Sequence, residues 1–215
     1  MSLELYGRAT SYNVQKVLWF LDELNLQYKH IECGGEYGGL ESKEFGVLNP
    51  LRKVPVLVDN GASIRESNTI LRFLAASYGG DLWWSESPIE RAEYEKWMDW
   101  SIDKFESSFT GVFWGYYRTP KSRRNFETIN KHIKAYVSCL SFLDKQLEKN
   151  RYVSGVNISL SDITLGVFIY RLQDIGLEIP LGPNISRWYA QLRTRKAFCT
   201  WVLSDFSQLK GREDY

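Results

Sequence analysis

The stretch from residue 53 to residue 71 constrains the fold of this chain more than any other part of its sequence. A short apolar run is followed by Asn60-Gly61 and by a second extended run over 63–65. Asn-Gly is typical of a two-residue hairpin turn, because both central positions of a type I′ turn need a positive φ. Ser67 then suits the N-cap of a helix that carries apolar residues at helical spacing. The stretch therefore predicts a strand, a tight turn, a second strand and a capped helix.

Three features of this stretch exceed what a hairpin requires. Pro55 opens a strand, and a cis Val54–Pro55 bond would let the backbone groups of Val54 pair with an extended, peptide-like ligand. Ser67 and the free N–H groups of the helix start suit a carboxylate, and Glu66 suits an ammonium group. Glutathione carries both groups at its γ-glutamyl end, followed by a peptide backbone. The alternative interpretation is an ordinary edge hairpin with a capped helix.

The composition is that of a globular protein without a nucleic-acid surface. The 215 residues carry a net charge of +1, and the basic group over 121–124 is interpreted as a solvated helix start. The sequence indicates neither a signal peptide nor an apolar run of membrane-spanning length. Cys33, Cys139 and Cys199 are few and far apart, which favours free thiols in a reducing compartment. We therefore expect a cytoplasmic protein with no nucleic-acid and no membrane partner.

The N-terminal third alternates between strand and helix patterns. Strands are predicted over 3–6 and 28–32, an amphipathic helix from 14 to about 25, and a short helical stretch over 42–47. A strand, a helix and a strand in one sheet imply a parallel pair with a right-handed crossover, and the hairpin adds antiparallel strands. This is the thioredoxin-like α/β plan. The loop after the first strand holds no cysteine, which argues against dithiol chemistry on the protein's own sulfurs.

That loop leads into a helix N-terminus, where N–H groups and the helix dipole favour an anion such as a thiolate. Ser11 can donate a hydroxyl hydrogen bond, Asn13 an amide hydrogen bond, and Thr10 supplies a second hydroxyl. Donors directed at a sulfur stabilise the thiolate and lower the pKa of the thiol. A shift of about two pKa units corresponds to roughly 3 kcal/mol. The alternative role for Ser11 is to cap the helix, and both roles can coexist.

Beyond a break at Gly79-Gly80 the sequence predicts helices alone. Ser87, Pro88 and Glu90 match the start of a helix with a capping box. This first helix is expected to end in the ring-rich passage around Gly111, because glycine interrupts helical patterns.

Four further helical segments complete the predicted all-helical part. They are expected over 129–147, 163–172, 185–192 and 198–202. Ser159 and Asp162 form a second capping-box pattern, ahead of the apolar segment 163–172, and we assign it a structural role.

The segment Val54-Pro55-Val56-Leu57, a hairpin, and the run from Glu66 to Leu71 ahead of a helix resemble the glutathione-binding signature of the cytosolic glutathione S-transferase superfamily. The resemblance spans the whole chain. It implies a thioredoxin-like glutathione-binding domain over residues 1–78 and an all-helical domain over 86–215. The pattern Ser11-x-Asn13 resembles the loop of bacterial-type members, in which a Ser or Thr with an Asn two residues on faces the sulfur. Tyr6 lies near the position of the tyrosine in the Tyr-type classes, but the loop length favours Ser11.

The resemblance also implies the remaining site residues. Ser11 and Asn13 would be catalytic. Glutathione would be bound by Asn49, Lys53, Val54, Pro55, Glu66 and Ser67. The hydrophobic electrophile pocket would be formed by Tyr12, Phe109, Phe113, Trp114 and Tyr117. Arg52 stands where many relatives have glycine, and with Lys53 it favours the terminal carboxylate of the tripeptide. Arg65 is a further departure, because an apolar residue is common there.

The function that the resemblance implies is glutathione conjugation in detoxification. Glutathione would be a co-substrate, its partner a small hydrophobic electrophile, and the assembly a homodimer. His30 and His132 are isolated, so no metal is expected. Two alternatives stay open. One is a glutathione-dependent peroxidase or disulfide-bond reductase, and the other is a non-catalytic glutathione-binding protein of the same fold.

Overall fold

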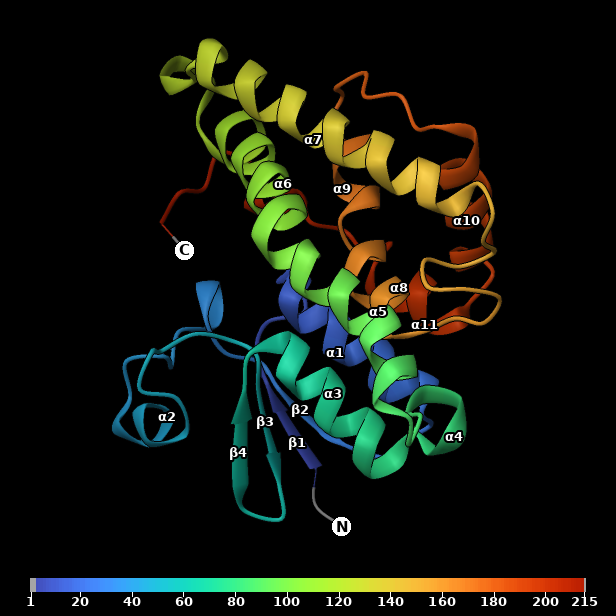
Figure 1. The fold of residues 1–215 in the computed structure, drawn as a ribbon. Helices are drawn as coiled ribbons and strands as arrows, with labels where there is room; N and C mark the ends of the chain where they lie inside the picture. Colours follow the sequence, from blue (N-terminus) through green and yellow to red (C-terminus); the bar gives the residue numbers. More distant parts are fainter. Residues whose placement is uncertain (1–2, 215) are drawn as a thin grey trace.

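The computed structural model describes residues 3–214, and its N-terminal part is built on a four-stranded mixed sheet (Figure 1). The strands are β1 (Leu3–Tyr6), β2 (Lys29–Ile31), β3 (Val56–Asp59) and β4 (Ala62–Arg65), in the order β2-β1-β3-β4. β1 pairs in parallel with β2 and antiparallel with β3, and β4 pairs antiparallel with β3. The predicted thioredoxin-like topology is therefore confirmed.

The two faces of this sheet serve different cores, because successive side chains of a strand point to opposite sides. Leu5 and Leu57 belong to the main core, which also holds α1 (Tyr12–Glu23) and α3 (Ser67–Tyr78). Val56 belongs to a small second cluster with Cys33 and with Phe45 of α2 (Lys43–Leu48). Figure 1 shows α2 set apart from the other helices, on the side of the sheet away from α3.

Helix α1 is more deeply buried than its amphipathic pattern predicts. All residues from Val14 to Leu21 are buried, and these include Gln15 and Lys16. The cause is the position of α1, which packs against α3 within the sheet part and against α8 (Leu160–Gly166) and α11 (Lys196–Trp201) of the helical part. The ring of Trp19 lies edge-on to Phe198 at 4.8 Å, so one continuous core joins the two parts.

The helical part begins with one long rod that does not end where the sequence predicted. The rod runs from α5 (Pro88–Trp100) through π-helical turns Ser101–Glu106 to α6 (Ser107–Val112), and continues in π-helical turns Phe113–Arg118 (Figure 1). The expected break at Gly111 is wrong. A Cβ at Gly111 would lie 2.3 Å from the ring of His132 in α7 (Phe126–Leu147), so this glycine permits close packing of two helices.

The other helices follow the prediction with smaller changes, except for the short α4, which lies where the sequence predicted only a break. They are α4 (Gly80–Trp83), α9 (Ile169–Asp174) and α10 (Pro183–Leu192), in addition to α7, α8 and α11. The single helix predicted over 163–172 is two helices, because the chain leaves helical pairing between α8 and α9. None of the helices within residues 3–214 is long and apolar enough to cross a membrane.

Three predicted helix caps have different outcomes. The capping box at Ser159 is present, and its backbone N–H donates to Asp162 Oδ2 at 2.9 Å. At α5, Ser87 holds the N-cap position without a side-chain bond, and Glu90 accepts a hydrogen bond from Ser85 rather than from the backbone of Ser87. At α3 the N-cap is Glu66, with φ of 69°, and not the predicted Ser67, which is the first helical residue.

Candidate functional site

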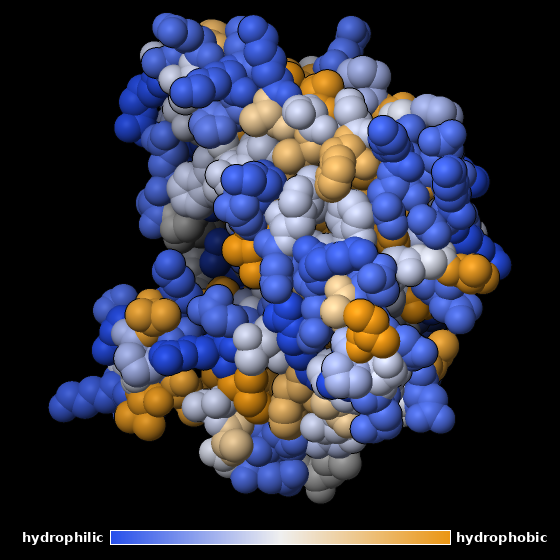
Figure 2. Space-filling view, viewed as in Figure 1, coloured by the Kyte–Doolittle hydropathy of each residue, from blue (hydrophilic) through white to orange (hydrophobic). Residues whose placement is uncertain are grey.

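Two adjoining cavities lie at the junction of the sheet part and the helical part. The smaller has a volume of about 240 Å³ and is lined by Asn13, Asn49, Leu51, Lys53, Val54, Pro55, Glu66, Ser67 and Glu106. The larger has a volume of about 440 Å³ and is lined by Arg8, Thr10, Ser11, Tyr12, Asn13, Leu40, Arg52, Lys53, Val54, Thr110, Phe113, Trp114, Arg118, Arg171 and Leu209. Figure 2 shows a hollow at the left of the molecule, between the sheet part below and the helical part above. The cavities share Asn13, Lys53 and Val54.

The smaller cavity brings together all six residues that were predicted to bind glutathione. The Val54–Pro55 peptide bond is cis. Asn49 is buried, and its amide donates to Lys53 O at 2.8 Å while its side-chain oxygen accepts from Leu51 N at 3.0 Å. Asn49 therefore holds the shape of the loop that leads into Val54, and its side chain is engaged within the protein.

The start of α3 supplies the polar end of the smaller cavity. Ser67 lines it as the first helical residue, next to the exposed Glu66, and its hydroxyl donates to Asn13 Oδ1 at 3.1 Å. The free N–H groups of the first helical turn add partial positive charge there. This end of the cavity can therefore accept a carboxylate, while Glu66 can face an ammonium group.

Ser11 lies at the N-terminus of α1 and lines the larger cavity. Its carbonyl accepts the first helical hydrogen bond, from Gln15 N at 2.9 Å, but its hydroxyl forms no capping bond. Ser11 therefore holds the N-cap position through its backbone, as the alternative expected, while its hydroxyl is available to a ligand. Thr10 Oγ1 beside it is buried and has no hydrogen-bond partner in the structure, so it is a second candidate donor.

Asn13 is held by groups that the sequence did not reveal. Its Oδ1 accepts from Lys16 Nζ at 2.8 Å, and its Nδ2 donates to Glu106 Oε1 at 3.2 Å. With Ser67 as the third partner, one amide proton remains for a ligand at most. Asn13 therefore connects α1, the start of α3 and the long rod. If Asn13 donates to sulfur as expected, it can do so only through the second proton of Nδ2.

Lys16 is the unexpected member of this network. Its side chain is fully buried, with Nζ 3.6 Å from Glu106 Oε2 and 4.9 Å from the centre of the Phe168 ring. Burial lowers the pKa of Lys16, and the nearby Glu106 carboxylate opposes this shift. The sequence shows Lys16 as a lysine between apolar residues of a predicted amphipathic helix. Its burial was not predicted, because the sequence did not indicate that this helix is buried on all sides.

The predicted aromatic pocket is brought together in part. Tyr12, Phe113 and Trp114 line the larger cavity. Phe109 does not line it, because this ring is fully buried and stacks against Phe113 at 5.6 Å. Tyr117 also lies outside the lining and stacks on the other side of Phe113 at 5.3 Å. Both rings therefore pack against Phe113, outside the lining of the cavity.

Two other aromatic hydroxyls near the site are not acidic. Tyr6 donates to Glu4 Oε2 at 2.8 Å, and burial together with this hydrogen bond raises its pKa. Tyr12 contacts Thr110 Oγ1 at 3.3 Å, and burial raises its pKa strongly. Both hydroxyls therefore stay protonated at neutral pH.

Arg52 serves the loop next to the site. It donates to Leu40 O at 2.5 Å and to Ser42 O at 3.0 Å, and its Nε lies 3.5 Å from Glu41 Oε2. The guanidinium of Arg52 is therefore already engaged by three partners within the protein. A contact with the terminal carboxylate of the tripeptide, as predicted, would be additional to these. Lys53 lines both cavities, whereas Arg65 is exposed and nothing in the structure explains its presence.

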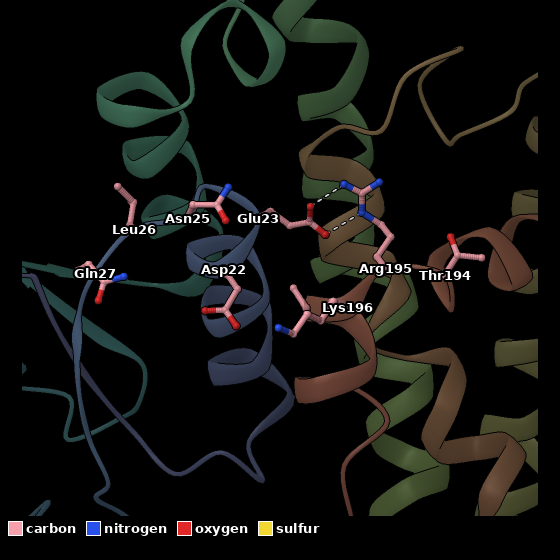
Figure 3. A pocket seen from close by; sticks show the side chains of 9 residues that line it. Asp22, Glu23, Asn25, Leu26, Gln27, Thr194, Arg195 and Lys196 are labelled. Atoms are coloured by element: carbon pink, nitrogen blue, oxygen red, sulfur yellow. Dashed lines mark hydrogen bonds and ion pairs between the residues drawn. The ribbon is translucent and has the colours of Figure 1, made fainter.

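A further cavity, with a volume of about 540 Å³, lies away from this site. It sits between the end of α1 and the start of α11, where Glu23 and Arg195 face one another (Figure 3). Arg195 Nη2 lies 2.5 Å from Glu23 Oε2, and Glu23 also accepts from Trp19 Nε1 at 2.8 Å. Because Glu23 and Arg195 form an ion pair with one another, we assign this cavity no ligand.

The thiols and potential metal ligands add no further site. Cys33, Cys139 and Cys199 are free, and burial raises the pKa of Cys33 to about 11. Within residues 3–214, no group of three or more His, Cys, Asp or Glu side chains is placed to hold a metal ion.

The fold and the two cavities define a protein with a thioredoxin-like domain joined to a helical domain and a ligand site at their junction. Residues 5–82 match the family described as "Glutathione S-transferase, N-terminal domain", and residues 126–191 match "Glutathione S-transferase, C-terminal domain". Glutathione S-transferase GstB of Escherichia coli (strain K12) is 40% identical over 197 residues, which are 91% of this chain and 95% of that protein. The chain belongs to the cytosolic glutathione S-transferase superfamily.

Two further relatives place the chain within this family. A theta class glutathione S-transferase from the citrus canker pathogen Xanthomonas axonopodis pv. citri, solved with glutathione bound, superimposes with a TM-score of 0.90 at 37% identity. The match covers 94% of this chain and 98% of that structure. The disulfide-bond oxidoreductase YfcG of Escherichia coli (strain K12) is 26% identical, over 91% of this chain and 92% of that protein.

Proposed function

We propose that the protein binds glutathione in the smaller cavity, ionises its thiol beside Ser11, and transfers it to an electrophile held in the larger cavity. The observation that carries this proposal is the junction of the two cavities at Asn13, Lys53 and Val54. A tripeptide in the smaller cavity has its sulfur directed toward that junction, where Ser11 offers an unused hydroxyl. In this proposal glutathione is a co-substrate, and no metal takes part in the reaction.

The binding half of the proposal follows the charges of the smaller cavity. The γ-glutamyl carboxylate lies against Ser67 and the N–H groups of α3, and its ammonium group faces Glu66. The backbone of Val54 pairs with the cysteinyl residue, as an added strand pairs with a sheet edge. Lys53 stands near the remaining carboxylate, at the glycine end.

The chemical half depends on stabilising the thiolate. The hydroxyl of Ser11 donates to sulfur, and the dipole of α1 and the buried cation of Lys16 favour the anion. A fall of about two units in the thiol pKa corresponds to roughly 3 kcal/mol of stabilisation. The thiol proton passes to solvent, and the thiolate attacks an electrophile against Phe113 and Trp114.

The proposal extends to the setting of the protein. We infer a cytoplasmic detoxification enzyme with a glutathione-binding domain over 1–78 and a helical domain over 86–215. We further infer a homodimer. Support comes from Val47 of α2 and Leu51, which are 82% and 58% exposed, because large apolar side chains at such exposure are suited to a partner. Sedimentation of the purified protein tests the assembly.

The function is tested by a titration with glutathione followed by turnover of 1-chloro-2,4-dinitrobenzene. We expect saturable binding, thiolate absorbance in the ultraviolet at neutral pH, and conjugation that exceeds the uncatalysed rate. Absence of glutathione binding contradicts the proposal. Binding with an unshifted thiol pKa and no turnover supports the non-catalytic alternative.

A second candidate function is glutathione-dependent reduction of disulfides or peroxides. It is favoured by the similarity to YfcG, whose name describes a disulfide-bond oxidoreductase, and by a thiol-free loop over 8–13 that leaves glutathione as the source of sulfur. Turnover of a mixed glutathione disulfide or of cumene hydroperoxide that exceeds turnover of the aryl chloride would establish it.

A further inference from the structure

The side-chain amide of Asn13 lies between a group that can only donate hydrogen bonds and a group that can only accept them. Its Oδ1 accepts from Lys16 Nζ at 2.8 Å, and its Nδ2 donates to Glu106 Oε1 at 3.2 Å. An ammonium group has no acceptor, and an ionised carboxylate has no donor. A flipped amide would direct its NH₂ group at the ammonium and its oxygen at the carboxylate. The two charged neighbours therefore admit one orientation of Asn13 and exclude the other.

The two charged groups also hold one another. The side chain of Lys16 is fully buried, and its Nζ lies 3.6 Å from Glu106 Oε2. Removing Glu106 would leave Lys16 as a buried cation without its carboxylate, which is costly. Glu106 is the last residue of the π-helical turns Ser101–Glu106 in the long rod, and π-helical turns are frequent at functional sites. Lys16 belongs to α1, so only the assembled fold brings the two charges to Asn13.

The orientation of the amide decides which group Asn13 presents to a ligand. Asn13 belongs to the lining of both cavities, and Glu106 to the lining of the smaller one. Ser67 donates to Oδ1 as well, at 3.1 Å, so this oxygen already has two partners. The group left over is the second proton of Nδ2, which is a donor. A flipped amide would present a carbonyl oxygen instead, and an oxygen dipole of that sign repels a thiolate.

We propose that Lys16 and Glu106 are positioning residues that fix the Asn13 amide with its free N–H toward the sulfur of glutathione. This inference rests on the proposed function, because it assigns how a second donor to the thiolate, beside Ser11, is oriented. Both residues act on the thiol through Asn13. The negative charge of Glu106 thereby favours a thiolate, although by its own field it would oppose one.

The substitution Glu106→Gln distinguishes these two effects, because they predict shifts of opposite sign. Removing a negative charge near the sulfur favours the anion, so a direct effect lowers the pKa of the bound thiol. Glutamine can both donate and accept, so it also admits the flipped amide. The donor to sulfur is then lost in part of the molecules. A role in orienting Asn13 therefore predicts that the thiol pKa rises.

The experiment follows the ultraviolet absorbance of the thiolate of bound glutathione against pH. In Glu106→Gln we expect the thiol pKa to rise by about one unit, the loss of one hydrogen bond to a charged group. Turnover of 1-chloro-2,4-dinitrobenzene should fall about tenfold at pH values below the thiol pKa and approach the wild-type value above it. Affinity for S-methylglutathione, which has no ionisable thiol, should stay within about twofold. A thiol pKa that falls or stays unchanged overturns the proposal.

A matched control and two further variants identify the path of the effect. Asp103→Asn removes the same charge from the same π-helical turns, but Asp103 is 69% exposed and lies outside both linings, so the thiol pKa should not change. Lys16→Gln also admits both orientations and should raise the thiol pKa. If this buried site does not fold with glutamine, Glu106→Gln still decides, because the Glu106 side chain is 19% exposed. In an Asn13→Ala background, Glu106→Gln should cause no further rise, and a further rise overturns the proposal.

Nuclear magnetic resonance of the protein without glutathione separates this inference from the proposed function. The amide protons of Asn13 are assigned by their loss in Asn13→Ala. We expect one pair of signals in the wild type, and a second pair or averaged shifts in Glu106→Gln. If the wild type does not lower the thiol pKa of glutathione, the proposed function fails, but this loss of a single orientation still supports the positioning role. A lowered thiol pKa in the wild type with an unchanged single orientation in Glu106→Gln leaves the function intact and overturns the inference. An unshifted thiol pKa together with an unchanged orientation overturns both.

Discussion

The two cavities that meet at Asn13, Lys53 and Val54 are built in opposite ways. The smaller takes most of its lining from one segment, residues 49–67, whereas the larger gathers side chains from the loop after β1, the long rod, α9 and residue 209. A cavity made by one segment follows from local turns and caps. A cavity made by distant segments follows from helix packing, which local sequence patterns do not specify.

The cavities also differ in charge. The smaller combines Glu66 and Glu106 with Lys53, as a zwitterionic ligand requires, whereas the larger has five cations and, within the described lining, no acid. If this difference is functional, binding of glutathione and recognition of the second substrate are separable by substitution.

The largest effect is expected for Ser11→Ala, in the lining of the larger cavity. Removing a donor that stabilises a developing anion costs about 100-fold in turnover, or about 2.7 kcal/mol. We expect kcat to fall by this amount, the thiolate absorbance of bound glutathione to disappear, and the affinity for glutathione to change little. Stopped-flow absorbance and steady-state kinetics measure the three quantities.

The control for this substitution is Ser11→Thr, which retains the hydroxyl and should retain the thiolate absorbance. Unchanged absorbance in Ser11→Ala would transfer the activating role to another donor. Thr10 is then the first candidate, because its buried hydroxyl has no partner in the structure.

A second effect concerns Asp162, which is buried in the helical part and is bonded to Val153, Ser159 and Trp188. Burial raises its pKa from 3.8 to about 6, against hydrogen bonds from Val153 N, Ser159 and Trp188 that lower it. Because the pKa of the folded state is above that of the unfolded state, the folded state binds more protons between these values. The contribution of Asp162 to stability is therefore complete at low pH and is lost as pH rises through about 6.

The free energy of unfolding of the wild type relative to Asp162→Asn should consequently fall by about 2.5 kcal/mol from about pH 4 to about pH 7.5. Denaturant titrations of both proteins across this range measure the difference and cancel the effects of other carboxylates. A difference that rises with pH would mean that the hydrogen bonds outweigh burial and that the carboxylate is favoured in the fold.

A third effect concerns the close contact between α6 and α7 at Gly111. Gly111→Ala places a methyl group 2.3 Å from the His132 ring, so α6 and α7 must move apart, at a cost of about 2 kcal/mol in stability. Gly115→Ala is the matched control, since its Cβ would meet Ile129 at 3.0 Å and should cost less. The double substitution with His132→Ala should recover much of the loss. Equal destabilisation by the two alanines would contradict this account of Gly111.

Gly111 also shows where sequence reasoning stopped. The topology of the sheet and the hairpin followed from local patterns, and the fold class was confirmed. Pro55, Glu66 and Ser67 of the smaller cavity were predicted from local patterns, whereas Asn49 and Lys53 were predicted from the family resemblance. The glycine was interpreted as a helix end, because a sequence does not distinguish a break from a close approach of a second helix. Lys16 and Arg171 were missed for the same reason, since their burial results from packing between parts far apart in the chain.

The smallest effect is expected for Ser67→Ala, in the smaller cavity. The substitution removes one hydrogen bond to a ligand carboxylate and the contact with Asn13 Oδ1, while the N–H groups of α3 remain. A single bond to a charged group contributes about 1.5 kcal/mol, so the KM for glutathione should rise by about tenfold while kcat and the KM for the second substrate stay unchanged. Initial-rate kinetics with each substrate varied in turn separate these constants. If kcat falls as much as in Ser11→Ala, the two cavities are coupled through Asn13, and the division between a binding cavity and a reaction cavity is wrong.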